Sequence, residues 1–164
     1  MKNFQSFDGT ITMINDFVTG SNEEIGCTKL ISVDNGYGTL TNFVVKPNTY
    51  FIDYAAVVVG DKVTGFYDAN VPVPLIFPPQ FQAIVIAKYI PYQNVKVDNF
   101  NEQLESSDGK LKLNISPSTQ ILLTNGQFFT GNLANRNLIV IYGLTTMSIP
   151  AQTTPYKIIV LCQK

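Results

Sequence analysis

Apolar residues along this chain recur at every second position or gather in short continuous runs, a pattern typical of β-strands. Examples are "GTITMINDFV", "CTKLISVD" and "KVTGFYD" in the first half, and "NLIVIY" and "YKIIVLC" in the second. Turn residues (Gly, Pro and Asn) separate about eleven such runs. Asn35-Gly36 lies between two of them and is a strong hairpin signal, because both residue types accept positive φ. The pattern predicts an all-β protein.

Helical periodicity is nearly absent. The one window that tolerates a helix, "NFNEQLESS" (99–107), has no apolar stripe and ends in the turn sequence "SSDG". The run "TYFIDYAAVVV" (49–59) is rich in aromatic and β-branched residues, so we expect a strand there as well.

One pattern occurs twice. Residues 63–87 and 138–162 each contain an apolar run that ends in tyrosine, a proline-bearing stretch and a second apolar run. Upstream, "VVKPNTYFI" parallels "NISPSTQIL", and the second copy then gains about five residues near "NGQFFTGN". The common order predicts an internal duplication with domains 1–92 and 93–164; chance similarity between strands is the alternative. The matched pairs are Pro47 with Pro117, Thr49 with Thr119, Tyr67 with Tyr142, Ile84 with Ile159 and Val85 with Val160.

Residues 8–88 contain a long first strand, a hairpin, a Gly60-Asp61 turn before a fourth strand, a long loop and a last strand. This order resembles the OB-fold family. The resemblance implies two small Greek-key barrels, the second (94–162) with a reduced opening strand. No helix is predicted between the third and fourth strands, where many OB folds have one, so a single intertwined pseudo-symmetric barrel is the alternative. The sequence also resembles uncharacterised β-proteins of anaerobic spore-forming bacteria, which implies no activity.

The composition is 45% hydrophobic and only 14% charged, against about 25% charged in typical domains. The polar surface must therefore consist largely of Asn, Thr, Ser and Gln, which lose less on desolvation than charged groups do. This favours extensive contacts with other molecules, although a Thr/Asn-rich surface without partners is an equal alternative. A net charge of −1 argues against a general nucleic-acid binder.

The sequence offers little catalytic chemistry. It has no histidine, which excludes Ser-His-Asp and Cys-His sites and histidine-based zinc sites. Cys27 and Cys162 lie in apolar runs, so buried free thiols are expected. Asp61 and Asp68 occupy turn positions. Asp53 is expected to face solvent from a strand, and a perturbed carboxylate in a hydrolase is the alternative for this residue. We therefore predict no enzyme, no catalytic or metal site and no cofactor.

The proline-rich stretch "VPVPLIFPPQF" is the strongest candidate for an interaction surface. Its prolines prevent it from completing a sheet ladder, so its apolar side chains need cover from elsewhere. The stretch either folds back over a barrel end or inserts into a neighbouring subunit, and "TTMSIPAQTTP" is a gentler second version. The second reading predicts a non-catalytic structural or self-assembling homo-oligomer, with Leu75, Ile76, Phe77, Phe81, Met147 and Ile149 as contact residues.

The alternative function is an OB-type binding module for single-stranded nucleic acid or oligosaccharide. The OB resemblance implies that the second and third strands carry the ligand, with few cations to favour nucleic acid. No secretory signal and no run long enough to span a bilayer is visible, so a cytoplasmic or spore- or cell-surface-associated protein is expected. The candidate ligand residues are Lys29, Tyr37, Thr41, Lys46 and Tyr50.

Overall fold

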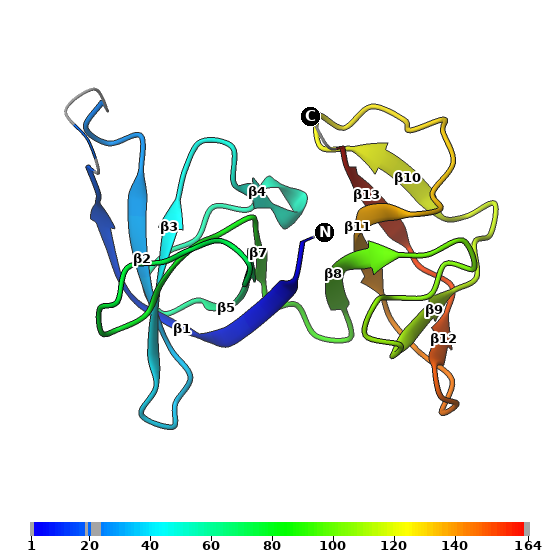
Figure 1. The fold of residues 1–164 in the computed structure, drawn as a ribbon, viewed down its shortest axis with the longest axis horizontal. Helices are drawn as coiled ribbons and strands as arrows, with labels where there is room; N and C mark the ends of the chain where they lie inside the picture. Colours follow the sequence, from blue (N-terminus) through cyan, green and yellow to red (C-terminus); the bar gives the residue numbers. More distant parts are fainter. Residues whose placement is uncertain (1, 19, 21–23, 163–164) are drawn as a thin grey trace. The chain divides into compact units, whose positions relative to one another are not determined.

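A computed structural model describes residues 2–18, 20 and 24–162. The chain divides into unit 1, Met1–Tyr89, and unit 2, Ile90–Lys164, three residues before the predicted boundary. The described residues form strands in sheets of seven, four and two strands and contain no α-helix (Figure 1). The prediction of an all-β protein is therefore confirmed.

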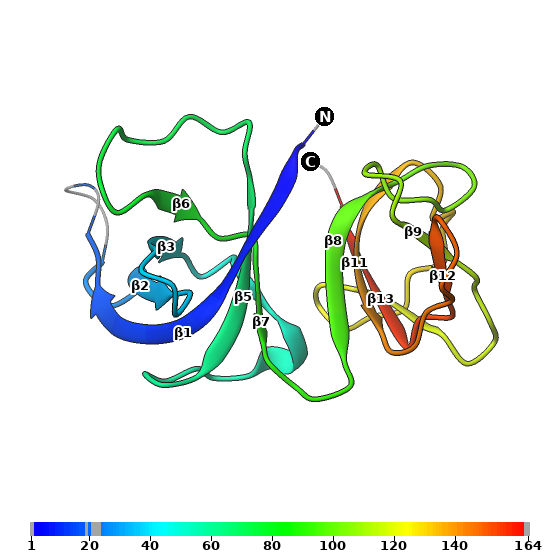
Figure 2. The ribbon, with the colours of Figure 1, turned by 90° about the horizontal axis from the view of Figure 1, so that it is seen from below.

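The described residues of unit 1 form seven strands in the order β4-β7-β5-β1-β2-β3-β6 (Figure 1 for β4, Figure 2 for the others). Neighbours are antiparallel, except that β3 pairs with β6 and β4 with β7 in parallel. Only two residues separate β6 from β7, so this segment pairs with β3 through its first part and with β5 through its second. The strands are β1 (Phe4–Asp16), β2 (Lys29–Asp34), β3 (Leu40–Val45), β4 (Tyr50–Phe51), β5 (Lys62–Asp68), β6 (Gln80–Gln82) and β7 (Val85–Lys88).

Strand β1 is long because its two halves pair with two different strands. Its first half pairs with β5, its second half pairs with β2, and the register shifts between Ile11 and Met13. Such a bulge bends a strand and increases its twist. Gly9 lets β1 approach β2 closely at this bend, because a Cβ there would lie 2.3 Å from the carbonyl oxygen of Asp34.

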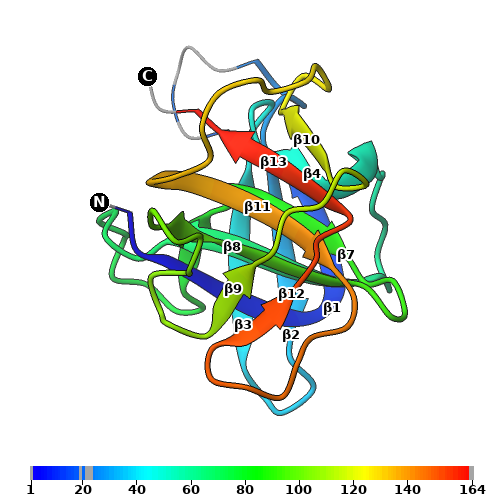
Figure 3. The ribbon, with the colours of Figure 1, turned by 90° about the vertical axis from the view of Figure 1, so that its right-hand side faces the viewer.

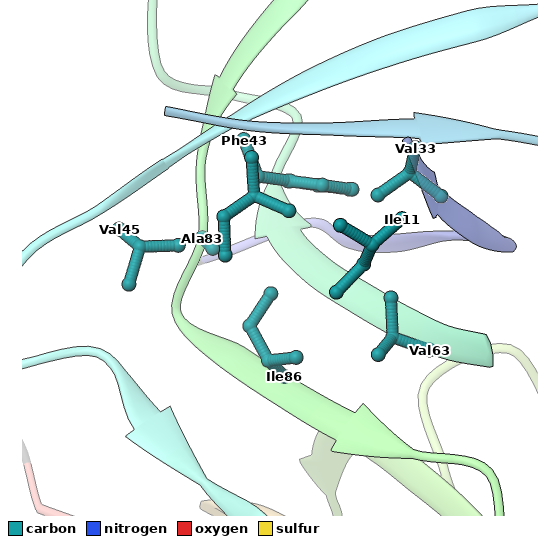
Figure 4. Close-up of a cluster of buried hydrophobic side chains, with 8 residues drawn as sticks. Ile11, Val33, Phe43, Val45, Val63, Ala83 and Ile86 are labelled. Atoms are coloured by element: carbon teal, nitrogen blue, oxygen red, sulfur yellow. The ribbon is translucent and has the colours of Figure 1, made fainter. Parts of the chain in front are cut away.

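The core of unit 1 is built from alternate positions of these strands, which point to one face of each strand. Ile11, Val33, Phe43, Val63 and Ile86 are all at most 3% exposed and meet in one cluster (Figure 4). Phe7, Phe81 and Tyr67 pack against this cluster from its edge. The period-2 pattern of the sequence therefore corresponds to a buried face.

Unit 2 contains six strands. Four form the order β10-β13-β11-β8, and β12 pairs with β9 in parallel (Figure 3). Isolated bridges join residue 100 to 106 and residue 105 to 112. Its core centres on Phe100, Leu138, Val140, Ile158 and Val160. The strands are β8 (Asn94–Phe100), β9 (Leu111–Leu113), β10 (Gln120–Leu123), β11 (Arg136–Tyr142), β12 (Ala151–Thr153) and β13 (Lys157–Leu161).

Two local predictions need correction. The expected strand at 49–59 is reduced to Tyr50–Phe51, because a 3₁₀ turn, Ile52–Tyr54, follows it and both Asp53 and Tyr54 adopt positive φ. The hairpin at Asn35-Gly36 exists, but Asp34 pairs with Leu40, so the loop is longer than a two-residue turn. Within the part of the chain that the structure describes, no helix has the length and apolar character needed to cross a membrane.

Candidate functional site

The loop between β5 and β6, residues 69–79, is the first apolar loop. It forms a long arch that contains no strand and is hydrogen-bonded to neighbouring strand segments at its ends, through Ala69 and Pro79 (Figure 2). Leu75 is fully exposed and Phe77 is 83% exposed, while Ile76 is just over half exposed. The prolines explain this course, since they have no N–H to donate to a ladder. The arch presents apolar side chains to solvent and does not cover them with its own unit.

The loop between β11 and β12, residues 143–150, is the second apolar loop, and it leads into β12 in Figure 3. Met147 and Ile149 are almost completely exposed, as is Leu144, which sequence analysis missed. Leu144 was missed because it follows the apolar run of β11 directly and resembles a continuation of that strand. A hydrogen bond from Gln152 N–H to the Thr146 hydroxyl, 2.9 Å long, closes the base of the loop.

Phe81 differs from the other predicted contact residues. It lies in β6, is partly buried, and stacks on Tyr67 with ring centroids 3.9 Å apart and planes 11° apart. The pair packs against the core of unit 1. Phe81 therefore anchors the end of the first apolar loop and does not belong to its exposed surface.

The predicted ligand residues do not form one surface. Lys29 opens β2 and pairs with the carboxylate of Asp16. Tyr37 lies at the opposite end of the same hairpin, within the loop 35–39. Thr41 is only 3% exposed, so its side chain is not available to a ligand, and the expectation for this residue is corrected. Lys46 is partly buried and lies beside a turn in which its N–H donates to the Thr49 hydroxyl.

Tyr50 lies in β4 and has a structural environment. Its ring meets that of Tyr54 edge-on, with centroids 5.7 Å apart. Burial is the main cause that raises the pKa of Tyr50 to about 12, and Tyr54 and the charge of Asp53 add to the increase. The phenol therefore stays protonated across the physiological range, and its hydroxyl forms a hydrogen bond with the Tyr54 side chain of the same unit.

The three acids considered from sequence occupy separate positions. Asp61 accepts a hydrogen bond from Val58 N–H at 2.9 Å, which is the main cause that lowers its pKa, and Lys88 adds a 3.4 Å ion pair. Asp68 accepts hydrogen bonds from the N–H groups of Asn3 and Asn70, each at 3.0 Å. Both acids therefore act as turn residues. Asp53 is exposed in the 3₁₀ turn, not in a strand.

Unit 2 contains a denser group of acids that sequence analysis did not single out. Asp98 is buried and accepts a hydrogen bond from the Ser107 hydroxyl. Asp108 pairs with Lys96 at 2.5 Å and accepts from Ser106 at 2.6 Å. Partial burial raises the pKa of Asp108, but these bonds and a backbone N–H outweigh burial and lower the pKa overall. These bonds hold the turn at 106–110 in place.

The two thiols are not where the sequence suggested. Cys27 and Cys162 are both exposed and unpaired, so the expectation of buried thiols is wrong for both. Cys27 precedes β2, and Cys162 follows β13 directly. Neither cysteine belongs to the strand that its apolar run forms, so neither side chain is covered by the sheet.

Among the described residues, no three or more Cys, Asp or Glu side chains lie close enough together to hold a metal ion. No family model, curated protein or solved structure matches the chain. Evidence on function must therefore come from the surfaces of the two units.

Proposed function

We propose that this is a non-catalytic protein that self-associates, and that the partner of each apolar loop is a second copy of the same chain. The supporting observation is that Leu75 and Phe77 in one loop, and Met147 and Ile149 in the other, extend into solvent from equivalent connections. Isolated exposed apolar residues are common, but groups of them on one surface mark interaction sites. The low charged fraction of the chain reduces the cost of desolvating the surrounding surface.

Magnitudes indicate how strong such contacts can be. Burying a Leu, Phe or Met side chain yields about 1.5–3 kcal/mol, so three such side chains in one loop yield about 5–9 kcal/mol. Association costs an estimated 4–15 kcal/mol in lost freedom. One loop alone therefore gives weak binding, and assembly needs both loops of each chain. Two non-identical surfaces favour head-to-tail contacts, which generate rings or filaments.

The proposal includes the architecture: each unit is a small OB-like Greek-key barrel, and the two arose by duplication. The strand pairings support this. The antiparallel pairs β1–β5 and β5–β7 have counterparts in β8–β11 and β11–β13, and the parallel pairs β3–β6 and β4–β7 have counterparts in β9–β12 and β10–β13. A β-solenoid would stack successive coils in parallel, whereas among the described residues four of the six strand pairs of unit 1 and two of the four of unit 2 are antiparallel.

Matching side-chain bonds support the duplication further. The Thr49 hydroxyl donates to the Ala83 carbonyl at 3.0 Å, and the Thr119 hydroxyl donates to the Pro155 carbonyl at 2.7 Å. Both apolar loops also end in a proline directly before the next strand, Pro79 before β6 and Pro150 before β12. The two apolar loops thus occupy equivalent places, as parts derived from one ancestral unit would.

Light scattering coupled to size exclusion, over a range of loading concentrations, tests self-association. We expect masses above that of one chain, rising with concentration. Replacing Leu75 and Phe77 with Ser should weaken association by at least about tenfold, because each side chain loses its burial energy. The double variant Met147→Ser, Ile149→Ser should do the same through the other loop.

The matched control is Tyr37→Ser, which removes an equally exposed large side chain from the hairpin tip of unit 1. It should leave the mass distribution unchanged. Unfolding midpoints of all variants should stay close to that of the parent chain, since none of these side chains is buried. A parent chain that remains monomeric at every concentration would refute the proposal.

The alternative, an OB-type binder using Lys29, Tyr37, Lys46 and Tyr50, stays a prediction. Lys29 and Tyr37 lie at opposite ends of the β2–β3 hairpin, and Tyr50 lies in β4, so these residues do not form one surface.

A further inference from the structure

A row of side chains crosses four adjacent strand segments of unit 1. Thr10 of β1 lies opposite Asp34 on one side and Lys62 on the other, and the N–H of Tyr89 donates to the carbonyl oxygen of Lys62. Directly opposed residues of a sheet point to the same face. Asp34, Thr10, Lys62 and Tyr89 therefore line one outward face, opposite to the core face of Val63.

A second row lies beside the first. Asp8 is two residues before Thr10, so it shares that face, and it is paired with Thr64 of β5. The Thr64 hydroxyl donates to Asp8 Oδ1 at 2.7 Å. The two rows and the hairpin turn around Gly36 enclose an open cleft of about 450 Å³, within the range of roughly 300–1,000 Å³ typical of small-molecule sites.

The polar groups of the cleft are only partly used. Asp34 Oδ1 accepts from the N–H of Gly36 at 2.8 Å, and Asp8 Oδ1 accepts from Thr64. In the described part of the chain, the second oxygen of each carboxylate accepts no hydrogen bond. The Tyr89 ring is 63% exposed and borders the same cleft. The face thus combines free acceptors, the Lys62 ammonium as donor and an aromatic surface.

The charges restrict which ligand can bind. Two carboxylates repel a phosphate or a nucleic-acid backbone, and a single lysine does not reverse that. Lys62 offsets one of the two carboxylates and so weakens the attraction of the cleft for a cationic amine. The carboxylates belong to no group of three acids that could hold a metal among the described residues. What remains is an uncharged ligand rich in hydroxyls.

We propose that this cleft binds a neutral sugar of one or two pyranose rings. The hydroxyls of a pyranose donate to the free oxygens of Asp8 and Asp34 and accept from Lys62, while its C–H face packs on the Tyr89 ring. Carboxylate acceptors form stronger hydrogen bonds than neutral groups do. Asp8, Asp34 and Lys62 lie in strands and Tyr89 directly follows one, which holds these residues in place without a ligand.

Unit 2 provides an internal comparison. There Asn137 takes the place of Lys62, opposite Asn99 and Leu161. The amide of Asn99 donates to the side-chain oxygen of Asn137 at 3.1 Å, and Asn137 is only 2% exposed. The two amides of this row therefore bond to each other, and Leu161 takes the place that Tyr89 has in unit 1, so the row offers no aromatic surface. We therefore assign the sugar site to unit 1 alone.

NMR titration of the ¹⁵N-labelled full chain with cellobiose, maltose and chitobiose tests the proposal. At least one disaccharide should shift the amide signals of Gly9, Gly36 and Lys62 in a saturable manner, with a Kd of roughly millimolar, typical of a shallow site. Tyr89→Ala should weaken binding by at least about tenfold, because it removes the stacking surface. Tyr92→Ala is the matched control, since Tyr92 is also exposed but does not line the cleft.

Loss of saturable shifts in Tyr89→Ala, with retention in Tyr92→Ala, supports the sugar site. The proposal is overturned if none of the three disaccharides shifts the cleft amides, or if the shifts persist unchanged in Tyr89→Ala. It is also overturned if spermidine saturates the cleft and the sugars do not, because that would indicate a cation site. Tyr89→Ala should leave the mass distribution unchanged, which separates this test from that of self-association.

Discussion

Gly65 lies directly against the ring of Phe43, so that a Cβ at position 65 would fall 2.4 Å from the Phe43 Cζ atom. Phe43 is completely buried and also meets the Tyr67 ring. The ring cannot move without disturbing the core, so Gly65→Ala should destabilise the protein by about 1–3 kcal/mol, the usual cost of overpacking. Urea unfolding followed by circular dichroism measures this change.

The control for this substitution is Gly20→Ala. No atom of the described residues lies within 4 Å of a Cβ built at Gly20, and its φ is not in the left-handed region. Its effect should stay within about 0.5 kcal/mol, as for other surface changes. Equal effects of the two substitutions would show that the contact with Phe43 is not what requires glycine at position 65.

The Thr119 hydroxyl should contribute measurably to stability. It is only 8% exposed, donates to the Pro155 carbonyl at 2.7 Å and accepts from the N–H of Ser116 at 3.4 Å. Thr119→Val keeps the volume but leaves buried polar groups without a partner, which costs about 1–3 kcal/mol. Thr119→Ser retains the hydroxyl and should cost less than half as much in the same unfolding experiment. Equal losses in both variants would assign the effect to packing.

Some of this arrangement could be read from the sequence. The period-2 alternation identifies the strands because one face of each is buried, as Ile11, Val33 and Phe43 illustrate. The match of Thr49 with Thr119 corresponds to the same bond in both units. Both features are local, since each depends on the chemistry of a few neighbouring residues, and the sequence displays such chemistry directly.

Other features depend on loop length or backbone strain, which no residue pattern reports. The match of Tyr67 with Tyr142 makes Phe66 equivalent to Ile141. Phe66 lies opposite Val85 in unit 1, and Ile141 lies opposite Lys157 in unit 2. Val85 therefore corresponds to Lys157 and not to Val160. The alignment failed here because the second apolar loop is three residues shorter than the first. The cleft of unit 1 was missed for a related reason: its rows form only when distant strands pair in one particular register.

Both thiols should react in the native protein. Cys27 and Cys162 are exposed, and exposure together with the thiolate fraction governs the reactivity of a cysteine. Native protein treated with Ellman's reagent at pH 8 should therefore release close to two thionitrobenzoate ions per chain, at rates similar to those in urea. The variants Cys27→Ser and Cys162→Ser should each release one. A thiol that reacts only after urea is added would contradict its exposure.

Tyr50 should make the protein less stable at alkaline pH. Because the pKa of its phenol is raised to about 12, the folded chain keeps a proton that the unfolded chain loses near pH 10. The stabilisation is complete below pH 10 and is lost as the pH rises from about 10 towards 12. The full shift would correspond to about 2.7 kcal/mol, but the ring is only partly buried, so solvent screening reduces the expected loss to roughly 1 kcal/mol.

Urea unfolding between pH 8 and 11 at fixed ionic strength measures this loss. The stability of Tyr50→Phe should decline less steeply with pH than that of the parent, whereas Tyr37→Phe, at an exposed position, should follow the parent curve. Some decline should persist in Tyr50→Phe, since burial also raises the pKa of Tyr67 and Tyr142. Parallel curves for the parent and Tyr50→Phe would show that this phenol has the same proton affinity in both states.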